Sequence, residues 1–179
     1  MLIIFLFFLL LCLLFLIVFL YLNFFYSLYL KVPMLSSEND AIRKVLENVD
    51  FEKASIFYDL GSGNGKLISQ IANQYPHLKC TGIEYNVSSF CLSKIRNIFL
   101  KQKVDYKRKD FFKIDISDAD IIYAYLFPGI MKSLENKFNQ ELKAGTLVVS
   151  TAFPIRSKEP KMIVRGEAGK LNTIYIYEY

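Results

Sequence analysis

Histidine and cysteine are scarce in this sequence, which has one histidine and three cysteines among 179 residues. Cys12, Cys80 and Cys91 form no CxxC pair and are too few for a disulfide framework, so we expect neither a metal site nor a disulfide scaffold. This cysteine usage is typical of a reducing compartment. The one histidine, His77, follows Pro76 in a predicted loop, and we interpret it as a loop residue and not as a catalytic base.

Charged side chains are missing from the first thirty residues, and residues 2–20 are almost purely Leu, Ile, Phe and Val. An apolar span of about 20 residues is long enough to cross the hydrocarbon core of a bilayer as a helix. A cleaved signal peptide would show a basic start, a shorter apolar region and a small-residue cleavage site, and this span shows none of them. We therefore predict a retained transmembrane anchor over residues 1–30, with a cleaved segment or a misplaced start as the alternative.

Basic residues lie only after this span, beginning with Lys31, Arg43 and Lys44. The positive-inside rule then predicts a single-pass membrane protein with its body in the cytoplasm. The net charge of +5 belongs to that body. A basic, tethered domain is attracted to an anionic lipid bilayer, although a solvated basic face is the alternative. We do not expect nucleic acid as a partner, because the basic cluster at 101–109 has no aromatic interleaving and no nucleic-acid motif.

The remaining chain reads as a linker with a helix over 31–50, capped by Ser36 or Ser37, and one domain over 51–179. Apolar runs predict strands at 55–60, 79–85, 104–109, 119–127 and 146–153. Helical spacing predicts helices that start near residue 67 and over 87–102 and 129–142. The last strands, 161–166 and 172–179, follow a connection too short for a crossover helix, so we predict an antiparallel hairpin joined near 167–170. The fold class is α/β, Rossmann-like and doubly wound, with a mostly parallel sheet and a C-terminal antiparallel hairpin.

The most informative motif begins where the first strand ends. Asp59 closes that strand, Gly61, Gly63 and Gly65 follow at alternate positions, and the second strand ends at Glu84. Such a βαβ unit binds a nucleoside at the carboxyl ends of the strands. The glycines let backbone amides approach a ligand, and the following helix offers free N–H groups to an anion. The GxGxG spacing departs from the GxGxxG pattern that suits NAD, which is therefore the second choice of ligand.

These residues resemble motif I of the class I S-adenosylmethionine (SAM) dependent methyltransferases. The resemblance implies that Asp59 fixes the cationic end of the cofactor and that Glu84 accepts its ribose hydroxyls. It also implies that Asp110 takes the adenine amine and that the Phe111 ring stacks on the base. The full set of expected cofactor-binding residues is Asp59, Gly61, Ser62, Gly63, Gly65, Glu84, Asn86, Asp110 and Phe111.

A narrower resemblance follows from the order of the segments. The segments that carry this resemblance are, in order, the anchor, DLGSGNGKL, GIEYN, YAYLFP, TAFPI and the final IYIYEY. The sequence resembles the membrane-anchored mitochondrial protein-lysine methyltransferases that modify the ATP synthase c subunit and the adenine nucleotide carrier. The sequence is similar in the same way to the uncharacterised prokaryotic relatives of that family. The resemblance implies a SAM-dependent enzyme whose partner is a membrane-associated protein substrate.

The methyl acceptor is expected at the end of the fourth strand, where Tyr123, Tyr125 and Pro128 lie. The Asn/Asp-Pro-Pro-Tyr motif of amino-group nucleic-acid methylases is absent. Aromatic side chains suit an aliphatic amine, because they desolvate it and hold it by cation–π contact. The alternative is that one or both tyrosines pack in the core. A lipid or quinone acceptor and a non-catalytic SAM-binding module also stay open.

Overall fold

The computed structural model describes residues 1–29, 39–101, 103–165 and 173–179, with only the backbone of 23–29. The predicted helix cap at Ser36 or Ser37, the basic residue Lys31 and the predicted turn at 167–170 lie outside the described residues. The chain divides into two compact units, 1–34 and 35–179.

The first unit contains one long helix, α1 (Leu2–Tyr29). Its segment Leu2–Leu22 is long and apolar enough to cross a membrane, and it lies near the N-terminus, where a signal sequence would satisfy the same test. No charged side chain interrupts the helix. The structure therefore contains the predicted apolar helix.

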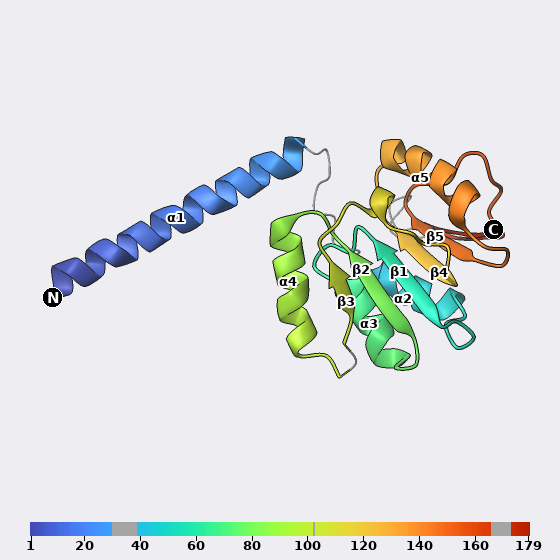
Figure 1. Ribbon diagram of the computed structural model, residues 1–179, viewed down its shortest axis with the longest axis horizontal. Coiled ribbons are helices and arrows are strands. Elements are labelled where there is room, and N and C mark those ends of the chain that lie inside the picture. The colour runs from blue at the N-terminus through green and yellow to red at the C-terminus, as the bar shows by residue number, and fades with distance from the viewer. Residues whose placement is uncertain (30–38, 102, 166–172) are drawn as a thin grey trace. The chain divides into compact units, whose positions relative to one another are not determined.

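The second unit is built on a seven-stranded sheet with the order β3-β2-β1-β4-β5-β7-β6 (Figure 1). The strands are β1 (Ile56–Leu60), β2 (Lys79–Ile83), β3 (Asp105–Lys107), β4 (Ile121–Ala124), β5 (Leu147–Thr151), β6 (Met162–Val164) and β7 (Ile174–Glu178). The first five strands are parallel. Strand β7 runs antiparallel to β5 and to β6, so the predicted mostly parallel sheet and its closing antiparallel hairpin are confirmed.

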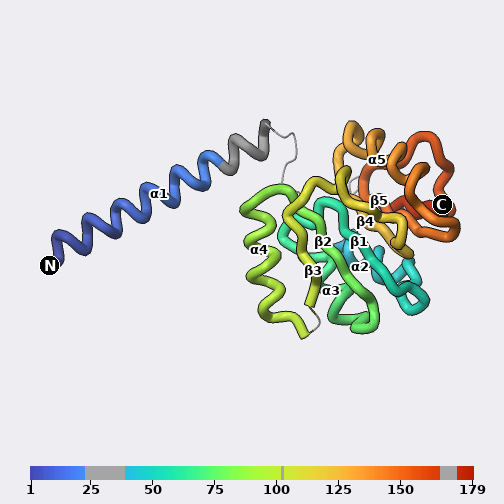
Figure 2. Tube along the Cα trace, viewed as in Figure 1, coloured from blue at the N-terminus to red at the C-terminus, as the bar shows by residue number. Residues whose placement is uncertain are grey.

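Helices cover both faces of this sheet, and the chain passes between the faces as it winds (Figure 2). On one face, α2 (Asn39–Asn48) and α3 (Lys66–Gln74) bury apolar side chains, and α4 (Val87–Ile98) adds Phe90. On the other face, α5 (Pro128–Glu141) buries Met131, Leu134 and Phe138, and the short 3₁₀ helix η1 (Phe111–Lys113) lies at the edge. Strands β1 and β4 are buried over almost their whole length, as central parallel strands covered on both faces should be.

Several predicted elements are longer than those of the structure, and for three of them the physical reason is clear. Helix α4 ends at Ile98, because Lys103 donates to the carbonyls of Asn97 and Ile98 and so closes the last turn. Strand β4 ends at Ala124, after which the apolar chain leaves the sheet and brings Leu126 against the glycine loop. Strand β5 ends at Thr151, because Ala152 adopts a φ of 66°, which a strand residue does not adopt.

Candidate active site

A glycine loop connects β1 to α3 at the carboxyl edge of the sheet. The backbone N–H groups of Gly61 and Ser62 donate to the carbonyl of Ile83, at 2.8 and 3.0 Å, so the loop is tied to the end of β2. Gly61, Gly63 and Gly65 all have positive φ, at 77°, 55° and 76°, a region that L side chains rarely occupy. A Cβ at Gly65 would lie 2.1 Å from the Tyr106 hydroxyl, whereas a Cβ at Gly63 would meet nothing within 4 Å. Gly65 is therefore required by the packing, and Gly63 faces open space.

Glu84 lies directly beside this loop. Its Oε2 accepts a hydrogen bond from the Gly63 N–H at 2.9 Å, and its Oε1 accepts one from the Asn86 N–H at 2.7 Å. A carboxylate offers about four acceptor positions, so acceptor capacity remains beyond these backbone donors. Burial raises the pKa of the Glu84 carboxyl, while these backbone donors oppose that rise. Glu84 therefore positions the loop and still has the capacity to accept hydroxyl groups of a ligand.

Asp59 is the second acid of the site and is 2% exposed. It lies opposite Gly82 on β2 and Tyr123 on β4, in the centre of the sheet. Burial, together with the nearby charge of Glu84, raises the pKa of Asp59 to about 8. None of the described residues donates a hydrogen bond or forms an ion pair with its carboxylate. A buried acid without a partner is costly, and a cationic ligand is the group that would compensate its charge.

A further unpaired polar group points to the same ligand. Among the described residues, the buried Ser62 hydroxyl has no hydrogen-bond partner. It belongs to the glycine loop, between the two glycines whose backbone contacts Ile83 and Glu84. Buried hydroxyl groups are normally satisfied, so this one is available to a polar ligand. The loop, Glu84 and Asp59 together can bind a molecule that carries hydroxyls, polar groups and a positive charge.

The other predicted cofactor residues serve local structure as well. Asn86 is the N-cap of α4, where its Oδ1 accepts from the Ser89 N–H at 3.1 Å. Asp110 caps η1 in the same way, through an Oδ1 bond to the Phe112 N–H at 3.0 Å. Phe111 is half-buried, and its ring centroid lies 4.8 Å from that of Phe112. Asp110 and Phe111 thus lie three and four residues beyond Lys107, the last residue of β3.

The predicted acceptor residues differ in exposure. Tyr123 is 2% exposed, and its hydroxyl accepts a hydrogen bond from the Thr151 hydroxyl at 2.9 Å. Tyr125 is half-buried and lies just beyond the end of β4, packed against the same cluster as Tyr123. Pro128 is exposed at the start of α5. Of these three residues, Tyr125 and Pro128 are accessible at the surface, and Tyr123 packs in the core.

Sequence reasoning missed several residues that complete the site. Tyr106 lies under the glycine loop, with its hydroxyl 3.4 Å from the Gly65 carbonyl. Phe127 and Phe153, which follow β4 and β5, form a ring pair with centroids 5.9 Å apart. Ala152 holds the strained turn that presents Phe153, with its N–H bonded to the Thr173 carbonyl at 2.8 Å. In the sequence, the only sign of this ring pair is that an aromatic residue follows each of the two strands, Phe127 after β4 and Phe153 after β5.

This combination of sheet order, glycine loop and two acids defines a class I SAM-dependent methyltransferase. The chain belongs to the family described as the ANTKMT methyltransferase domain, whose pattern it matches over residues 59–162. The residues present fit SAM: Asp59 would face its positive charge, the Ser62 hydroxyl and the loop amides its polar groups, and Glu84 its ribose.

Known proteins of similar sequence and structure agree with this assignment. The chain is 32% identical to a protein-lysine N-methyltransferase of Saccharolobus islandicus (strain REY15A), over 82% of this chain and 92% of that protein. It is 29% identical to the adenine nucleotide translocase lysine N-methyltransferase of Mus musculus, over 75% of this chain but only 59% of the mouse protein. The crystal structure of an RNA methyltransferase from Salinibacter ruber, in complex with S-adenosyl-L-homocysteine, matches with a TM-score of 0.70 and 26% identity. That match covers 80% of this chain and 93% of the Salinibacter protein.

Proposed function

We propose that this protein is a membrane-anchored methyltransferase that modifies lysine side chains of a membrane-associated protein. The observation that carries the proposal is the similarity to a protein-lysine N-methyltransferase over 92% of that relative's length. Both curated relatives act on lysine by name. The neighbour named an RNA methyltransferase makes RNA the competing acceptor.

The residues at the expected acceptor site support a lysine side chain as the methyl acceptor. Tyr125, Phe127 and Phe153, which we call the aromatic acceptor wall, follow the ends of the neighbouring parallel strands β4 and β5. All three side chains are half-buried, and they lie at the same edge of the sheet as the glycine loop. An aromatic environment removes water from an amine and lowers its pKa, so the neutral, nucleophilic form becomes accessible. It then holds the methylated cation by cation–π contact.

The chemistry places modest demands on the protein. When bound, SAM supplies an electrophilic methyl group on a sulfonium centre. Asp59 and Glu84 hold and orient the ligand, and the acceptor wall aligns the amine and excludes water, which supplies the proximity that such a transfer needs. The lysine ammonium loses its proton to solvent before it enters the acceptor wall, and the neutral amine is the nucleophile. The only histidine, His77, has its Nε2 3.3 Å from the Phe51 carbonyl and is not part of this site.

The anchor supports a membrane target. Leu2–Leu22 has the length and composition of a membrane span, and the basic residues Arg43 and Lys44 follow it on α2. Asp40 pairs with both of these residues, but acidic residues contribute little to membrane orientation. We therefore place the catalytic domain on the cytoplasmic side. The tether raises the effective concentration of membrane-embedded targets for this domain.

Two experiments test the proposal separately. Alkaline extraction of membranes, with protease treatment of intact cells, tests the anchor: we expect the protein to stay in the membrane fraction and its domain to stay uncut. Release into the soluble fraction, or digestion from outside, would refute the anchor or its orientation.

Incubation of the full-length protein with methyl-labelled SAM and membranes from its own source tests the acceptor. We expect the label in the protein fraction. Label confined to lipid, quinone or RNA would refute the lysine acceptor and leave the methyltransferase activity intact.

A further inference from the structure

Helix α4 exposes an apolar stripe that the other described residues of the domain do not cover. Only Ser89 and Ser93 of this helix are fully buried. Leu92, Ile95, Ile98 and the C-cap residue Phe99 are 51%, 54%, 69% and 81% exposed. Their three- and four-residue spacing places them along one side of the helix. In most surface helices the apolar side faces the core, whereas this apolar side of α4 is exposed.

The surroundings of this stripe carry charge of one sign. Lys94, Arg96, Lys101 and Lys103 are exposed, and residues 85–104 contain no Asp or Glu. No carboxylate among the described residues forms an ion pair with any of these four cations. Lys103 donates to the last carbonyls of α4, and Lys94, Arg96 and Lys101 stay exposed beside the stripe without a carboxylate partner among the described residues. The helix therefore combines an exposed apolar stripe with exposed positive charge, the composition of a helix that lies in a membrane interface.

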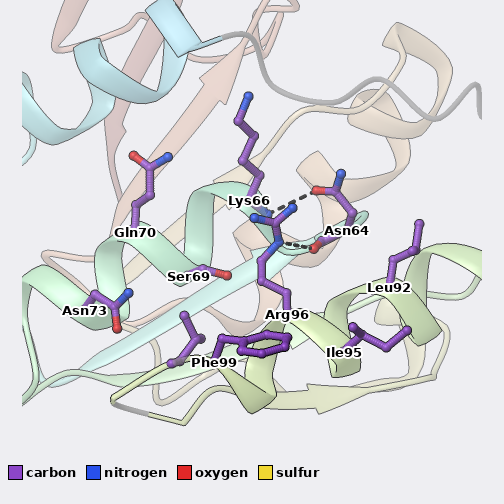
Figure 3. Close-up of a pocket in the computed structure, with 10 residues that line it drawn as sticks. Asn64, Lys66, Ser69, Gln70, Asn73, Leu92, Ile95, Arg96 and Phe99 are labelled. Carbon is purple, nitrogen blue, oxygen red and sulfur yellow. Dashed lines mark hydrogen bonds between the residues drawn. The ribbon is translucent and has the colours of Figure 1, made fainter.

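A groove of about 520 Å³ runs between α4 and α3 (Figure 3). Leu92, Ile95 and Phe99 line it from α4, and polar residues such as Gln70 and Asn73 line it from α3. Arg96 lies between these sides, where its Nε donates to the Asn64 carbonyl at 3.0 Å. The groove thus places apolar surface, which suits an acyl chain, next to a cation, which suits an anionic lipid headgroup.

We infer that α4 lies in the surface of an anionic bilayer, with the apolar stripe among the acyl chains and its cations against the headgroups. The inference rests on the proposed anchoring by α1. The nine residues between Tyr29 and Asn39 can span at most about 30 Å, so the domain stays near the bilayer that holds α1. Exposed cations beside the stripe favour a bilayer over a neutral protein surface, because anionic lipids attract Lys and Arg.

The contact of α4 with the bilayer, in addition to that of α1, would orient the domain relative to the membrane. Helix α4 begins at Val87, three residues after Glu84, whose carboxylate contacts the glycine loop. A domain held by α1 alone could rotate freely, whereas a domain that also docks through α4 keeps its cofactor edge at a fixed distance from the membrane. Docking therefore favours acceptors that protrude from the bilayer by that distance.

The absence of tryptophan from the chain permits a clean test. Phe99→Trp introduces a single fluorescent reporter on the stripe of the full-length protein, which is reconstituted into vesicles that contain anionic lipid and lipids brominated on their acyl chains. We expect a blue-shifted emission that the bromine quenches. Gln140→Trp, an exposed position on α5, is the matched control and should be neither shifted nor quenched. Adding Ile95→Glu and Ile98→Glu to Phe99→Trp should abolish the quenching while the protein stays with the vesicles.

Each failure has its own signature. If the protein does not float with the vesicles at all, the anchor is refuted, and with it the basis of this inference. If the protein floats but Phe99→Trp emits like Gln140→Trp, the anchor stands and docking of α4 is refuted. A blue shift without bromine quenching would show that a protein surface, such as a second copy, covers the stripe, and this result also overturns docking on lipid.

Discussion

The Gly63 N–H donates to Glu84 Oε2 across 2.9 Å, and this bond joins the glycine loop after β1 to the acid after β2. Glu84 also accepts from the Asn86 N–H, so one carboxylate connects the loop to the first turn of α4. Removal of a buried hydrogen-bonded charge leaves its donors unsatisfied. The glycine loop and the start of α4 are therefore joined through a single side chain.

Glu84→Ala should weaken SAM binding by about 1.5–3 kcal/mol, because charged hydrogen bonds are lost, and should also lower the melting temperature. Glu84→Gln should weaken binding less and retain more stability, since its amide oxygen can replace one of the two acceptors. Calorimetric titration and thermal unfolding of both variants measure the two effects. Wild-type affinity in folded Glu84→Ala would show that Glu84 does not contact the ligand.

The glycine loop gives two substitutions with opposite expected outcomes. Gly63→Ala should fold with about 1–2 kcal/mol of backbone strain and lose SAM binding, because its Cβ enters the open space beside the loop. Gly65→Ala should be far less stable, because its Cβ would meet the buried Tyr106 hydroxyl at 2.1 Å. Adding Tyr106→Phe should restore only part of that stability, since the ring carbon Cζ still lies 2.8 Å away. Chemical denaturation and SAM titration on the same samples decide whether the two glycines differ in this way.

The raised pKa of Asp59, about 8, predicts a dependence of stability on pH. Between its ordinary pKa near 4 and about 8, the folded protein holds a proton that the unfolded chain releases, so the free energy of unfolding falls as pH rises through this window. Asp59→Asn removes this effect. The variant should therefore be more stable than the wild type at pH 8, should be similar to it at pH 4, and should bind SAM less well.

The same group makes SAM binding depend on pH. In the wild type the affinity for SAM should rise toward pH 8, as Asp59 becomes a carboxylate that attracts the positive charge, and in Asp59→Asn it should stay flat. Denaturation curves and titrations at several pH values provide both readouts. If the free energy of unfolding of the wild type increased from pH 5 to pH 8 relative to that of Asp59→Asn, the claim that Asp59 is a buried neutral acid would be wrong.

Tyr125→Ala tests the acceptor wall. Tyr125 lies beyond the end of β4 and is half-buried, so its removal should lower turnover far more than SAM affinity. Tyr179→Ala is the control, because Tyr179 is also a half-buried tyrosine but lies at the opposite edge of the sheet, beside Thr146. Steady-state kinetics on a lysine peptide should show reduced turnover for Tyr125→Ala alone. Equal losses in both variants would mean that the effect is general destabilisation.

Local patterns predicted the fold and the cofactor edge. Buried parallel strands appear in the sequence as continuous apolar runs. The cofactor edge was predictable because a parallel sheet brings its strand ends to one edge, where Asp59, the glycines and Glu84 lie. Tertiary contacts fixed what the sequence could not show. Tyr106 packs under Gly65 from a strand forty residues away, and Asn97 and Lys103 end α4 through contacts with the following loop.

The acceptor side was the hardest part to predict. Apolar residues at 125–127 continue the pattern of β4, so hydropathy cannot show that the chain leaves the sheet there. Burial of Tyr123, with its hydroxyl bonded to Thr151, depends on a contact between two strands. The exposed stripe of α4 illustrates the same difficulty, because its helical spacing is identical to that of a buried face and only the fold shows that it is exposed.

Mass spectrometry of the methylated product tests the central claim most directly. Full-length protein and SAM are incubated with membranes from its own source, and membranes alone provide the background. We predict methylated lysine in a membrane-associated protein, at a level that falls in the Tyr125→Ala variant. Methyl groups found only on lipid, quinone or RNA, with every lysine unmodified, would contradict the assignment of lysine as the acceptor.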